Sequence, residues 1–232
     1  MSKEKRYLAV EGPIGVGKTS LVNLLTERLG AVKIQEKVQE NPFLPLFYSD
    51  RKKYAFQTQM SFLLSRYNQL FQLRQMDLFH AWTVADYILP KDRIFAYMNL
   101  SDHELPIYEQ IYAILNERIP SPDLVIYLQA GTDVLMKRIK GRGRSYENTI
   151  TKEYVEAVNQ AYEYFFFHYS DTPMLVIKTS EIDFVRSAED LDDLIRHILQ
   201  MDKGTRYYAP LSTKEKKRAP LDKETLFKEF EI

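Results

Sequence analysis

The chain has 232 residues, of which 45% are hydrophobic, and this is enough for one sizeable domain with a buried core. Lysine plus arginine and aspartate plus glutamate both number 32, so no overall positive field would draw the protein to nucleic acid or to an anionic membrane. The sequence has no cysteine and no pattern typical of a signal peptide, a transit peptide or a bilayer-spanning stretch. We therefore expect a cytoplasmic protein with neither a nucleic-acid nor a membrane partner.

The first predicted element is a short strand, Tyr7 to Val10, which runs directly into the segment GPIGVGKT at residues 12–19. This segment fits the phosphate-binding loop pattern of glycine, four residues, glycine, lysine and a hydroxyl residue. Leucines at helical spacing follow it, and Gly30 is a typical helix stop. The strand before the loop and the helix after it argue against the alternative, an ordinary glycine-rich turn.

A loop of this kind binds nucleoside polyphosphates. Its glycines let backbone N–H groups converge on phosphate oxygens, and the helix directs its positive end to the same place. Lys18 supplies a mobile positive charge, and Thr19 can bind magnesium. The residues expected to bind the nucleotide are Gly12, Gly15, Val16, Gly17, Lys18, Thr19 and Ser20.

Strands and helices alternate along the rest of the chain. The longest apolar pattern free of proline and glycine runs from Tyr54 to Phe79 and predicts one long amphipathic helix. Further strands are predicted at residues 31–34, 83–85, 124–128 and 174–177, and further helices at 92–100, 103–118, 132–140, 152–169 and 188–202. This alternation indicates an α/β fold with a parallel sheet covered by helices on both faces.

The main domain is predicted to span residues 1–202, because the pattern becomes irregular beyond Met201. Residues 203–232 then form a C-terminal extension that includes a charged cluster from Lys214 to Arg218. Two interpretations stay open for this extension. It is solvated, or it docks on the body or on a neighbouring subunit through Leu221, Leu226, Phe227 and Phe230.

Two carboxylates follow predicted strands, where the ligands of parallel α/β sheets bind. Glu36 comes directly after the second strand and could take a proton from an attacking hydroxyl, although a solvated loop glutamate is the plainer interpretation. Asp86 ends the third strand, after Trp82, Thr83, Val84 and Ala85. An apolar strand followed by aspartate is the arrangement that holds magnesium in phosphate-loop proteins, and a simple turn aspartate is the alternative.

Arg138, Arg142 and Arg144 form a basic segment interleaved with Gly141 and Gly143. A helix that ends in a glycine-loosened arginine segment suits a lid that clamps phosphates and neutralises developing charge. The alternative is a solvated basic helix end, which the repeated Gly-Arg pattern disfavours.

Gln59 and Arg66 are seven positions apart on the long helix and so share a face, with Phe62 between them. Such a face could hydrogen-bond the edge of a base while the aromatic ring packs on it. Glutamine offers both a donor and an acceptor, which matches adenine. The competing interpretation places Gln59 and Arg66 at the rim of a packed helix.

Several motifs in order resemble the deoxyribonucleoside kinases, particularly the bacterial deoxyadenosine and deoxyguanosine kinases. They are EGPIGVGKTSL, QEKVQENPFLPLFY, AFQTQMSFLLSRYNQL, VADY, DRIFAYMNL and IKGRGRSYENTI, and the likeness runs from about Arg6 to Met201. The resemblance implies a phosphate-loop fold with a five-stranded parallel sheet of order 2-3-1-4-5, an arginine lid, and usually a homodimer. It also implies ATP as the phosphoryl donor and Mg²⁺ as the cofactor.

The same resemblance implies roles for individual residues. Glu36 matches the general base that activates the nucleoside 5′-hydroxyl, and Phe62 matches a pocket position linked to base size. Residues expected at the sugar 3′-hydroxyl are Tyr48 and Glu147, those at the base are Gln59, Arg66 and Asp92, and the lid arginines are Arg138, Arg142 and Arg144. The segment from Glu181 to Phe184, with Asp183 and Phe184, resembles the loop that cradles the adenine of ATP.

One departure from the family lies at the end of the third strand, where many relatives have Asp or Glu followed by Arg and Ser. This chain has Asp86, Tyr87 and Ile88, so the arginine is missing and its charge must be compensated differently. A bacterial purine-kinase subgroup looks similar at this point.

Together these features predict a kinase that transfers the γ-phosphoryl of ATP to the 5′-hydroxyl of a purine deoxynucleoside, for salvage of DNA precursors. Deoxyadenosine is the first choice, followed by deoxyguanosine and deoxycytidine, because a glutamine amide can flip to suit another base. A nucleoside-monophosphate kinase and a non-catalytic nucleotide-binding protein are the rivals. The first would need a second anion site, and the second would not need Lys18, Thr19, Glu36, Asp86 and the lid arginines together.

Overall fold

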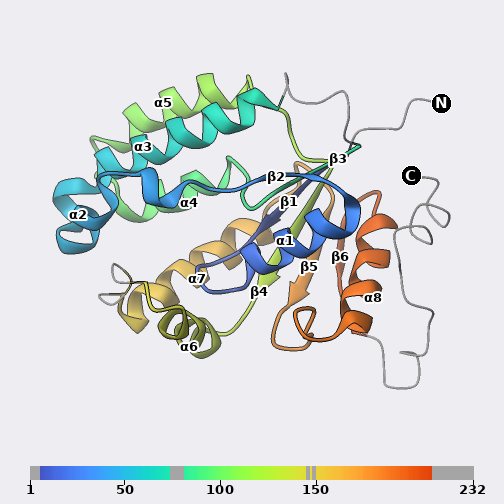
Figure 1. Cartoon of the computed structure of the whole chain (residues 1–232). Helices are drawn as coiled ribbons and strands as arrows, with labels where there is room; N and C mark the ends of the chain where they lie inside the picture. The colour runs from blue at the N-terminus through green and yellow to red at the C-terminus, as the bar shows by residue number, and fades with distance from the viewer. Residues whose placement is uncertain (1–5, 74–80, 145–146, 148–149, 211–232) are drawn as a thin grey trace.

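A parallel sheet forms the centre of the computed structural model, which describes residues 6–73, 81–144, 147 and 150–210 (Figure 1). Within these residues the strand order is β2-β3-β1-β4-β5-β6, and every neighbouring pair is parallel. The strands are β1 (Arg6–Glu11), β2 (Val32–Ile34), β3 (Trp82–Ala85), β4 (Leu124–Gln129), β5 (Met174–Lys178) and β6 (Thr205–Tyr207). The predicted order of the first five strands is confirmed.

The sheet has a sixth strand that the sequence did not predict. β6 lies in the segment assigned to the C-terminal extension, and it pairs with the outer edge of β5. Its three residues are exposed and include no apolar run, so no strand pattern marks them. The expected count of five strands was therefore one too few. The predicted docking residues Leu221, Leu226, Phe227 and Phe230 lie outside the described residues.

The helices form where the periodic patterns predicted them. They are α1 (Lys18–Leu29), α3 (Arg51–Gln72), α4 (Lys91–Asn99), α5 (Leu105–Asn116), α6 (Thr132–Arg142), α7 (Lys152–Phe167) and α8 (Ala188–Leu199). The long helix α3 begins three residues before its predicted start because the side chain of Asp50 accepts a hydrogen bond from the backbone N–H of Lys53, at 3.2 Å. Residues 74–79 of the predicted helix lie outside the described residues.

Two short helical elements were not predicted. A 3₁₀ turn, η1 (Val38–Glu40), and a six-residue helix, α2 (Leu44–Ser49), connect β2 to α3. Neither is long enough to show a helical repeat of apolar residues, and prolines stand at positions 42 and 45. Leu44 and Phe47 of α2 are buried and pack against Ala55 of α3. This packing places α2 beside the first turn of the long helix.

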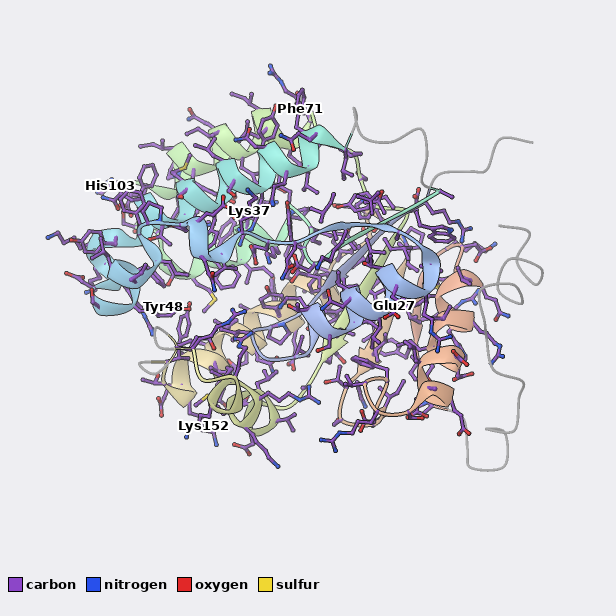
Figure 2. The ribbon with its side chains drawn as sticks, in the orientation of Figure 1. Glu27, Lys37, Tyr48, Phe71, His103 and Lys152 are labelled. Atoms are coloured by element: carbon purple, nitrogen blue, oxygen red, sulfur yellow. The ribbon has the colours of Figure 1, made fainter. Side chains whose placement is uncertain are left out.

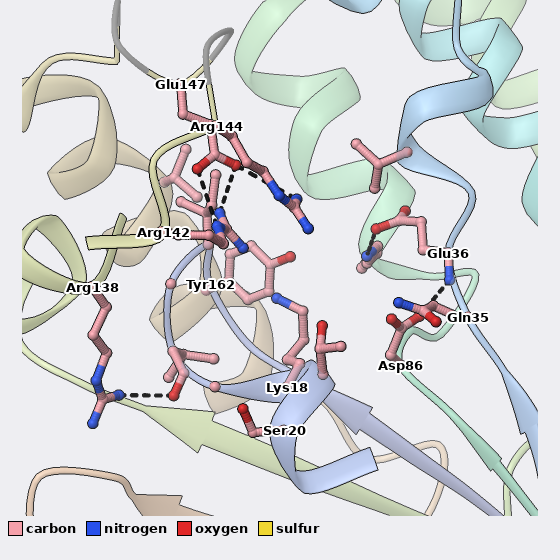
Figure 3. A pocket seen from close by; sticks show the side chains of 18 of the residues that line it. Lys18, Ser20, Gln35, Glu36, Asp86, Arg138, Arg142, Arg144, Glu147 and Tyr162 are labelled. Atoms are coloured by element: carbon pink, nitrogen blue, oxygen red, sulfur yellow. Dashed lines mark hydrogen bonds and ion pairs between the residues drawn. The ribbon is translucent and has the colours of Figure 1, made fainter. Parts of the chain in front are cut away.

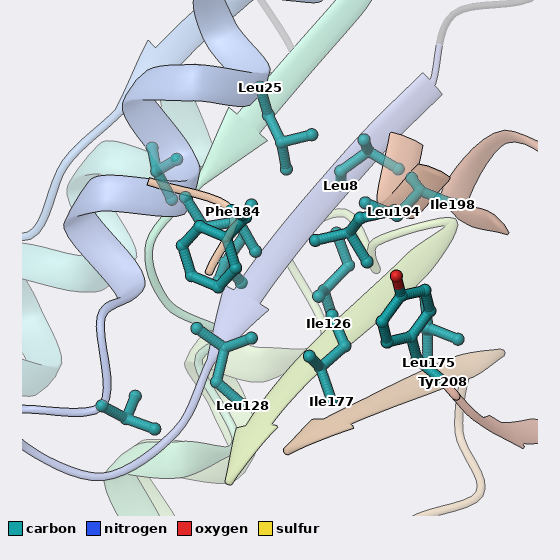
Figure 4. Close-up of a cluster of buried hydrophobic side chains, with 14 of the residues drawn as sticks. Leu8, Leu25, Ile126, Leu128, Leu175, Ile177, Phe184, Leu194, Ile198 and Tyr208 are labelled. Carbon is teal, nitrogen blue, oxygen red and sulfur yellow. The ribbon is translucent and has the colours of Figure 1, made fainter. Parts of the chain in front are cut away.

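Helices cover both faces of the sheet, which gives three layers (Figure 1). On one face, α1 and α8 pack against Leu8 and Val10 of β1 and against inward residues of β4 and β5 (Figure 4). On the other face, α4 and α7 pack against Ala9, while α3 and α5 cover the end of the sheet near β2 and β3. The alternation of Leu8, Ala9 and Val10 between the two faces is the two-residue period of a strand.

None of the described helices is long and apolar enough to cross a membrane.

The strand order changes direction at β1, which lies between β3 and β4. Chain connections from β1 and β3 leave towards opposite sides there, so a crevice opens at the carboxyl ends of these strands. The segment 12–19 follows β1, Glu36 follows β2 and Asp86 follows β3. The fold therefore brings the predicted functional residues to one edge of the sheet.

Candidate active site

One large pocket lies at the carboxyl edge of the sheet, with a volume of about 1430 Å³. Figure 3 shows its floor, where Lys18 at the start of α1 lies between Glu36 and Asp86 on one side and the arginines that follow β4 on the other. Most of the residues predicted from the sequence line it: Gly15, Val16, Gly17, Lys18, Thr19, Ser20, Glu36, Tyr48, Gln59, Phe62, Arg66, Asp86, Arg138, Arg142, Arg144, Glu147, Asp183 and Phe184. The pocket therefore joins the predicted phosphate site and the predicted nucleoside site in one space.

The glycine loop requires its glycines. Gly12 has φ of 151° and Gly15 has φ of 82°, conformations that residues with a side chain rarely adopt. A Cβ atom at Gly12 would lie 2.5 Å from the carbonyl oxygen of Leu128, so Gly12 also allows β1 and β4 to approach closely. Gly12, which was predicted to bind the nucleotide, does not itself line the pocket. The lining residues of this loop begin at Ile14.

Lys18 is the first residue of α1, and its ammonium group folds back over the glycine loop. Lys18 Nζ donates to the carbonyl oxygens of Gly12, at 2.5 Å, and Pro13, at 3.1 Å. Burial lowers the pKa of the Lys18 ammonium to about 8, against the negative charge of Glu11. The N-cap residue of α1 is Gly17, which has no side chain to cap the helix, so the N-terminal N–H groups remain available to an anion.

Glu36 is held at both carboxylate oxygens. Arg66 Nε donates to Glu36 Oε1 at 2.6 Å, and Lys91 Nζ donates to Glu36 Oε2 at 3.0 Å. Burial alone would raise the pKa of the Glu36 carboxyl, but the charges of Arg66 and Lys91 outweigh burial and lower this pKa to about 2. Glu36 is therefore an ionised, oriented hydrogen-bond acceptor, and its interpretation as a solvated loop residue is wrong for this structure.

Asp92 does not line the pocket, although it was predicted to bind the base. Its carboxylate is fully buried behind Gln59 and Arg66. Gln59 Nε2 donates to Asp92 Oδ2 at 2.6 Å, Tyr108 Oη donates to the same oxygen at 2.8 Å, and Arg66 pairs with Oδ1. Asp92 thus fixes the two side chains that do face the pocket, and because it takes the Gln59 N–H, the Gln59 amide oxygen is left to accept a hydrogen bond.

The three arginines of the predicted lid are tied to different partners. Arg138 donates from Nη1 to the carbonyl of Val16 and to the hydroxyl of Thr179, both at 2.9 Å, so it bridges the glycine loop and the segment after β5. Arg142 donates two hydrogen bonds to the buried carboxylate of Glu147, at 2.6 and 3.1 Å (Figure 3). Arg144 lies 3.7 Å from the same carboxylate. These arginines line one side of the pocket, as a phosphate clamp requires.

Thr19 and Asp86 lie in the pocket as expected for a magnesium site. The Asp86 carboxylate accepts a hydrogen bond from the backbone N–H of Glu36 at 2.7 Å, and burial raises its pKa. Among the described ranges, no cluster of three or more His, Cys, Asp or Glu side chains is arranged to hold a metal by itself. A threonine hydroxyl and an aspartate carboxylate are the kind of ligands that suit Mg²⁺ in a phosphate site, because this ion typically takes one or two protein ligands and completes its shell with phosphate oxygens and water.

Two charged residues of the site were not predicted, Glu11 and Lys91. Glu11 ends β1 and is fully buried, and its oxygens accept from the N–H groups of Gly12, at 2.9 Å, and Ile88, at 3.2 Å. Burial raises the pKa of the Glu11 carboxyl, although Lys91 and Lys18 oppose the shift. The signal available in the sequence was a carboxylate placed directly after Ala9 and Val10 in an otherwise apolar strand, which requires a buried positive partner.

Comparison with known proteins agrees with this architecture. Residues 8–201 match the deoxynucleoside kinase family. A deoxyguanosine kinase of Bacillus subtilis is 36% identical over 200 residues, which cover 84% of this chain and 97% of that protein. A deoxyadenosine kinase of Lactobacillus acidophilus is 33% identical over 207 residues, covering 83% of this chain and 94% of the relative.

The fold is also similar to solved structures. A deoxyadenosine kinase from M. mycoides with bound dATP superposes with a TM-score of 0.71 at 29% identity, covering 83% of this chain and 98% of that one. The same enzyme with the products dCMP and a flexible dCDP gives a TM-score of 0.72 at 31% identity, with the same coverage. Taken with the glycine loop, the strand-end carboxylates and the arginine segment around one pocket, the match places this chain in the deoxynucleoside kinase family.

Proposed function

We infer that this deoxynucleoside kinase transfers the γ-phosphoryl group of ATP to the 5′-hydroxyl of a purine deoxynucleoside, with deoxyadenosine as the first choice. The observation that carries this proposal is the single pocket in which the glycine loop and the anchored carboxylate of Glu36 face the same space. A nucleoside bound against α3 with its 5′-hydroxyl at Glu36 would lie next to the terminal phosphate held by Lys18. Phosphoryl transfer depends mainly on this kind of placement and on charge stabilisation.

The chemistry assigns a role to each group. The 5′-oxygen forms a bond to the γ-phosphorus as the bond from that phosphorus to the bridging oxygen of ADP breaks. Lys18 and the three lid arginines neutralise charge on the phosphoryl oxygens. Arg66 and Lys91 lower the pKa of Glu36 and keep it ionised, and its carboxylate orients the 5′-hydroxyl and accepts its proton as the new bond forms.

Magnesium would be held by the Thr19 hydroxyl and the Asp86 carboxylate. When bound, the ion supplies positive charge to the ATP phosphates.

Asp183 and Phe184 border the pocket beyond the glycine loop, where the adenine of ATP would lie. Tyr48 and Glu147 are the residues we assign to the sugar 3′-hydroxyl.

The preference for adenine rests on Gln59. Its amide N–H is committed to Asp92, at 2.6 Å to the carboxylate and 2.8 Å to the carbonyl, so its oxygen faces a ligand as an acceptor. The N6 amino group of adenine is a donor that would match it, and Phe62 beside Gln59 can pack on the ring. Guanine carries a donor at N1 that could use the same oxygen, which makes deoxyguanosine the second candidate. The similarity to relatives named for each base supports both.

The experiment that tests the function offers deoxyadenosine, deoxyguanosine, deoxycytidine, thymidine and deoxyadenosine monophosphate separately, with ATP and magnesium. Phosphorylation of a purine deoxynucleoside ahead of the pyrimidines, and no turnover of the monophosphate, is the expected result. Preferred turnover of the monophosphate would identify a nucleoside-monophosphate kinase. ATP binding without any turnover would identify a non-catalytic protein.

The pKa of Lys18 predicts how activity depends on pH. In the free enzyme the Lys18 ammonium loses its proton above about pH 8, so kcat/KM for ATP should fall as pH rises beyond that value. The kcat should hold to higher pH, because bound phosphates favour the charged form of Lys18. The measurement is the pH profile of both constants between pH 7 and 10. Lys18→Arg, whose guanidinium stays charged, should lose the alkaline fall in kcat/KM, and an unchanged fall would show that another group causes it.

We also expect a homodimer. Tyr97 of α4 and Tyr164 and Phe167 of α7 are 57%, 72% and 82% exposed, and these two helices pack side by side. Large apolar side chains gathered on neighbouring helices are typical of an interface between proteins. Sedimentation equilibrium should give twice the chain mass of 27.4 kDa, and Phe167→Asp should weaken the association. A mass of one chain at micromolar concentration would contradict the dimer.

A further inference from the structure

Lys91 lies at the floor of the pocket, between the buried carboxylate of Glu11 and the half-buried carboxylate of Glu36. It is the first residue of α4 and is only 2% exposed, an unusual position for a lysine. Its Nζ lies 3.0 Å from Glu36 Oε2 and 3.7 Å from Glu11 Oε2. Lys91 therefore joins the carboxylate that ends β1 to the carboxylate that follows β2.

Lys91 contributes to the charge compensation of both carboxylates: it shares Glu36 with Arg66, and it forms the ion pair with Glu11. Glu11 accepts its other hydrogen bonds from neutral groups, the N–H groups of Gly12 and Ile88 and the hydroxyl of Tyr162 at 3.3 Å. In the part of the chain that the structure describes, Lys91 is the cation that pairs with Glu11. A buried carboxylate without a positive partner is costly, so this pair has a clear electrostatic reason.

The position of Lys91 in α4 is otherwise unfavourable. The first turn of a helix carries partial positive charge, which disfavours a cation and favours an anion. A lysine that begins a helix and turns its ammonium into a pocket is thus poorly explained by helix stability. It is explained by the two carboxylates and by the phosphate groups that the pocket would receive.

The residue after Asp86 does not supply this charge. Tyr87 is fully buried, and its hydroxyl donates to Gln69 of α3 at 2.9 Å; neither residue is among those that line the pocket. Lys91 Nζ lies 5.6 Å from the centre of the Tyr87 ring, so the ring forms part of the wall behind the ammonium. One positive charge beside Glu36 therefore comes from Lys91 at the start of α4 and not from the residue after Asp86.

We propose that Lys91 is a positioning residue for phosphoryl transfer: it holds Glu36 Oε2 while Arg66 holds Oε1, and it offsets the buried charge of Glu11 at the start of the glycine loop. This inference rests on the proposed role of Glu36 as the acceptor for the 5′-hydroxyl. Each carboxylate oxygen has two acceptor positions, so Glu36 can bind both cations and still accept the substrate hydroxyl. Lys91 acts through Glu36 and need not touch the substrate.

Removing the charge should lower turnover more than binding. Lys91→Met should reduce kcat by roughly 100-fold, in the range found when one fixed charge-stabilising group is lost from an active site. The KM for the deoxynucleoside should change by less than about fivefold, because the base is held by Gln59 and Arg66 on α3. Lys91→Arg should restore kcat to within about tenfold of the parent, since it returns the charge. Lys33→Met, an exposed lysine of β2, is the matched control and should leave both constants unchanged.

The decisive experiment is a double-mutant cycle with Glu36→Gln. If Lys91 acts through Glu36, Lys91→Met should lower kcat by less than about threefold when Glu36 is already glutamine. An equal loss in both backgrounds, or a kcat near that of the parent in Lys91→Met alone, would overturn the proposal. Full activity of the single Glu36→Gln variant would instead overturn the proposed role of Glu36. If Lys91→Met does not fold, Lys91→Gln replaces it in the cycle, and a kcat for Lys91→Gln equal to that of Lys91→Arg counts against the proposal.

Discussion

Glu36→Gln should lower kcat by roughly 100- to 10,000-fold, the range expected when a general base is lost. The amide keeps the shape of the side chain but cannot accept the proton of the 5′-hydroxyl. It also places a neutral group where Arg66 and Lys91 now hold a carboxylate. The direct measurement is single-turnover phosphorylation at saturating ATP and deoxynucleoside.

Deoxynucleoside binding should be affected much less, by less than about tenfold, because the base contacts that we propose come from α3. Isothermal titration with the preferred nucleoside measures this separately from turnover. Glu27→Gln is the control: Glu27 is an exposed glutamate on α1, well apart from the pocket floor (Figure 2), and its substitution should leave kcat unchanged. A kcat within threefold of the parent in Glu36→Gln would contradict the role assigned to Glu36.

Arg66→Met should lower the free energy of unfolding by about 3–5 kcal/mol, as found when one partner of a buried ion pair is removed. Arg66 is 4% exposed and pairs with both Glu36 and Asp92. Methionine fills much of the same space but leaves the buried carboxylate of Asp92 and the half-buried carboxylate of Glu36 without that cation. Urea unfolding followed by circular dichroism measures the change, with the slope checked to be the same as in the parent.

A surface ion pair provides the matched control. Arg93 pairs with Glu109 at 3.0 Å and is 41% exposed, so Arg93→Met should cost less than about 1 kcal/mol. Adding Asp92→Asn to Arg66→Met should recover part of the loss, because it removes one of the stranded charges. Equal losses in the two arginine variants would mean that the Arg66 pairs contribute no more than a surface contact.

Much of the fold was predictable because it depends on local patterns. Strands β1, β3, β4 and β5 are apolar runs, and their helices show a repeat of about 3.6 residues. The elements that sequence reasoning missed are short and lack such a pattern. α2 has six residues and owes its position to Leu44 and Phe47, while β6 has three exposed residues and is defined by backbone pairing with β5.

The site was predictable where its residues follow strands or repeat along a helix. Glu36 and Asp86 were found from their positions after β2 and β3, and Gln59 and Arg66 from their shared helix face. Lys91 was missed because a lysine directly before a predicted helix is usually a surface residue. Its burial depends on Glu11 and Glu36, which are distant in the sequence. Asp92 was found, but its side chain faces Gln59 and Arg66, an orientation that only the packing of α3 against α4 determines.

The position of β6 near the C-terminal end of the described chain affects folding during synthesis and the outcome of truncation. Tyr208, just beyond β6, lies in the apolar cluster of Figure 4 and is 6% exposed, and its hydroxyl donates a hydrogen bond to Asp193 of α8 at 2.8 Å. During synthesis the sheet and its α8 layer therefore cannot be completed until residue 208 has emerged from the ribosome. A chain cut after residue 202, where the periodic pattern ends, would expose the edge of β5 to pairing with other chains and remove the hydroxyl donor from Asp193. Expression of a minimal kinase should accordingly retain the chain through Tyr208.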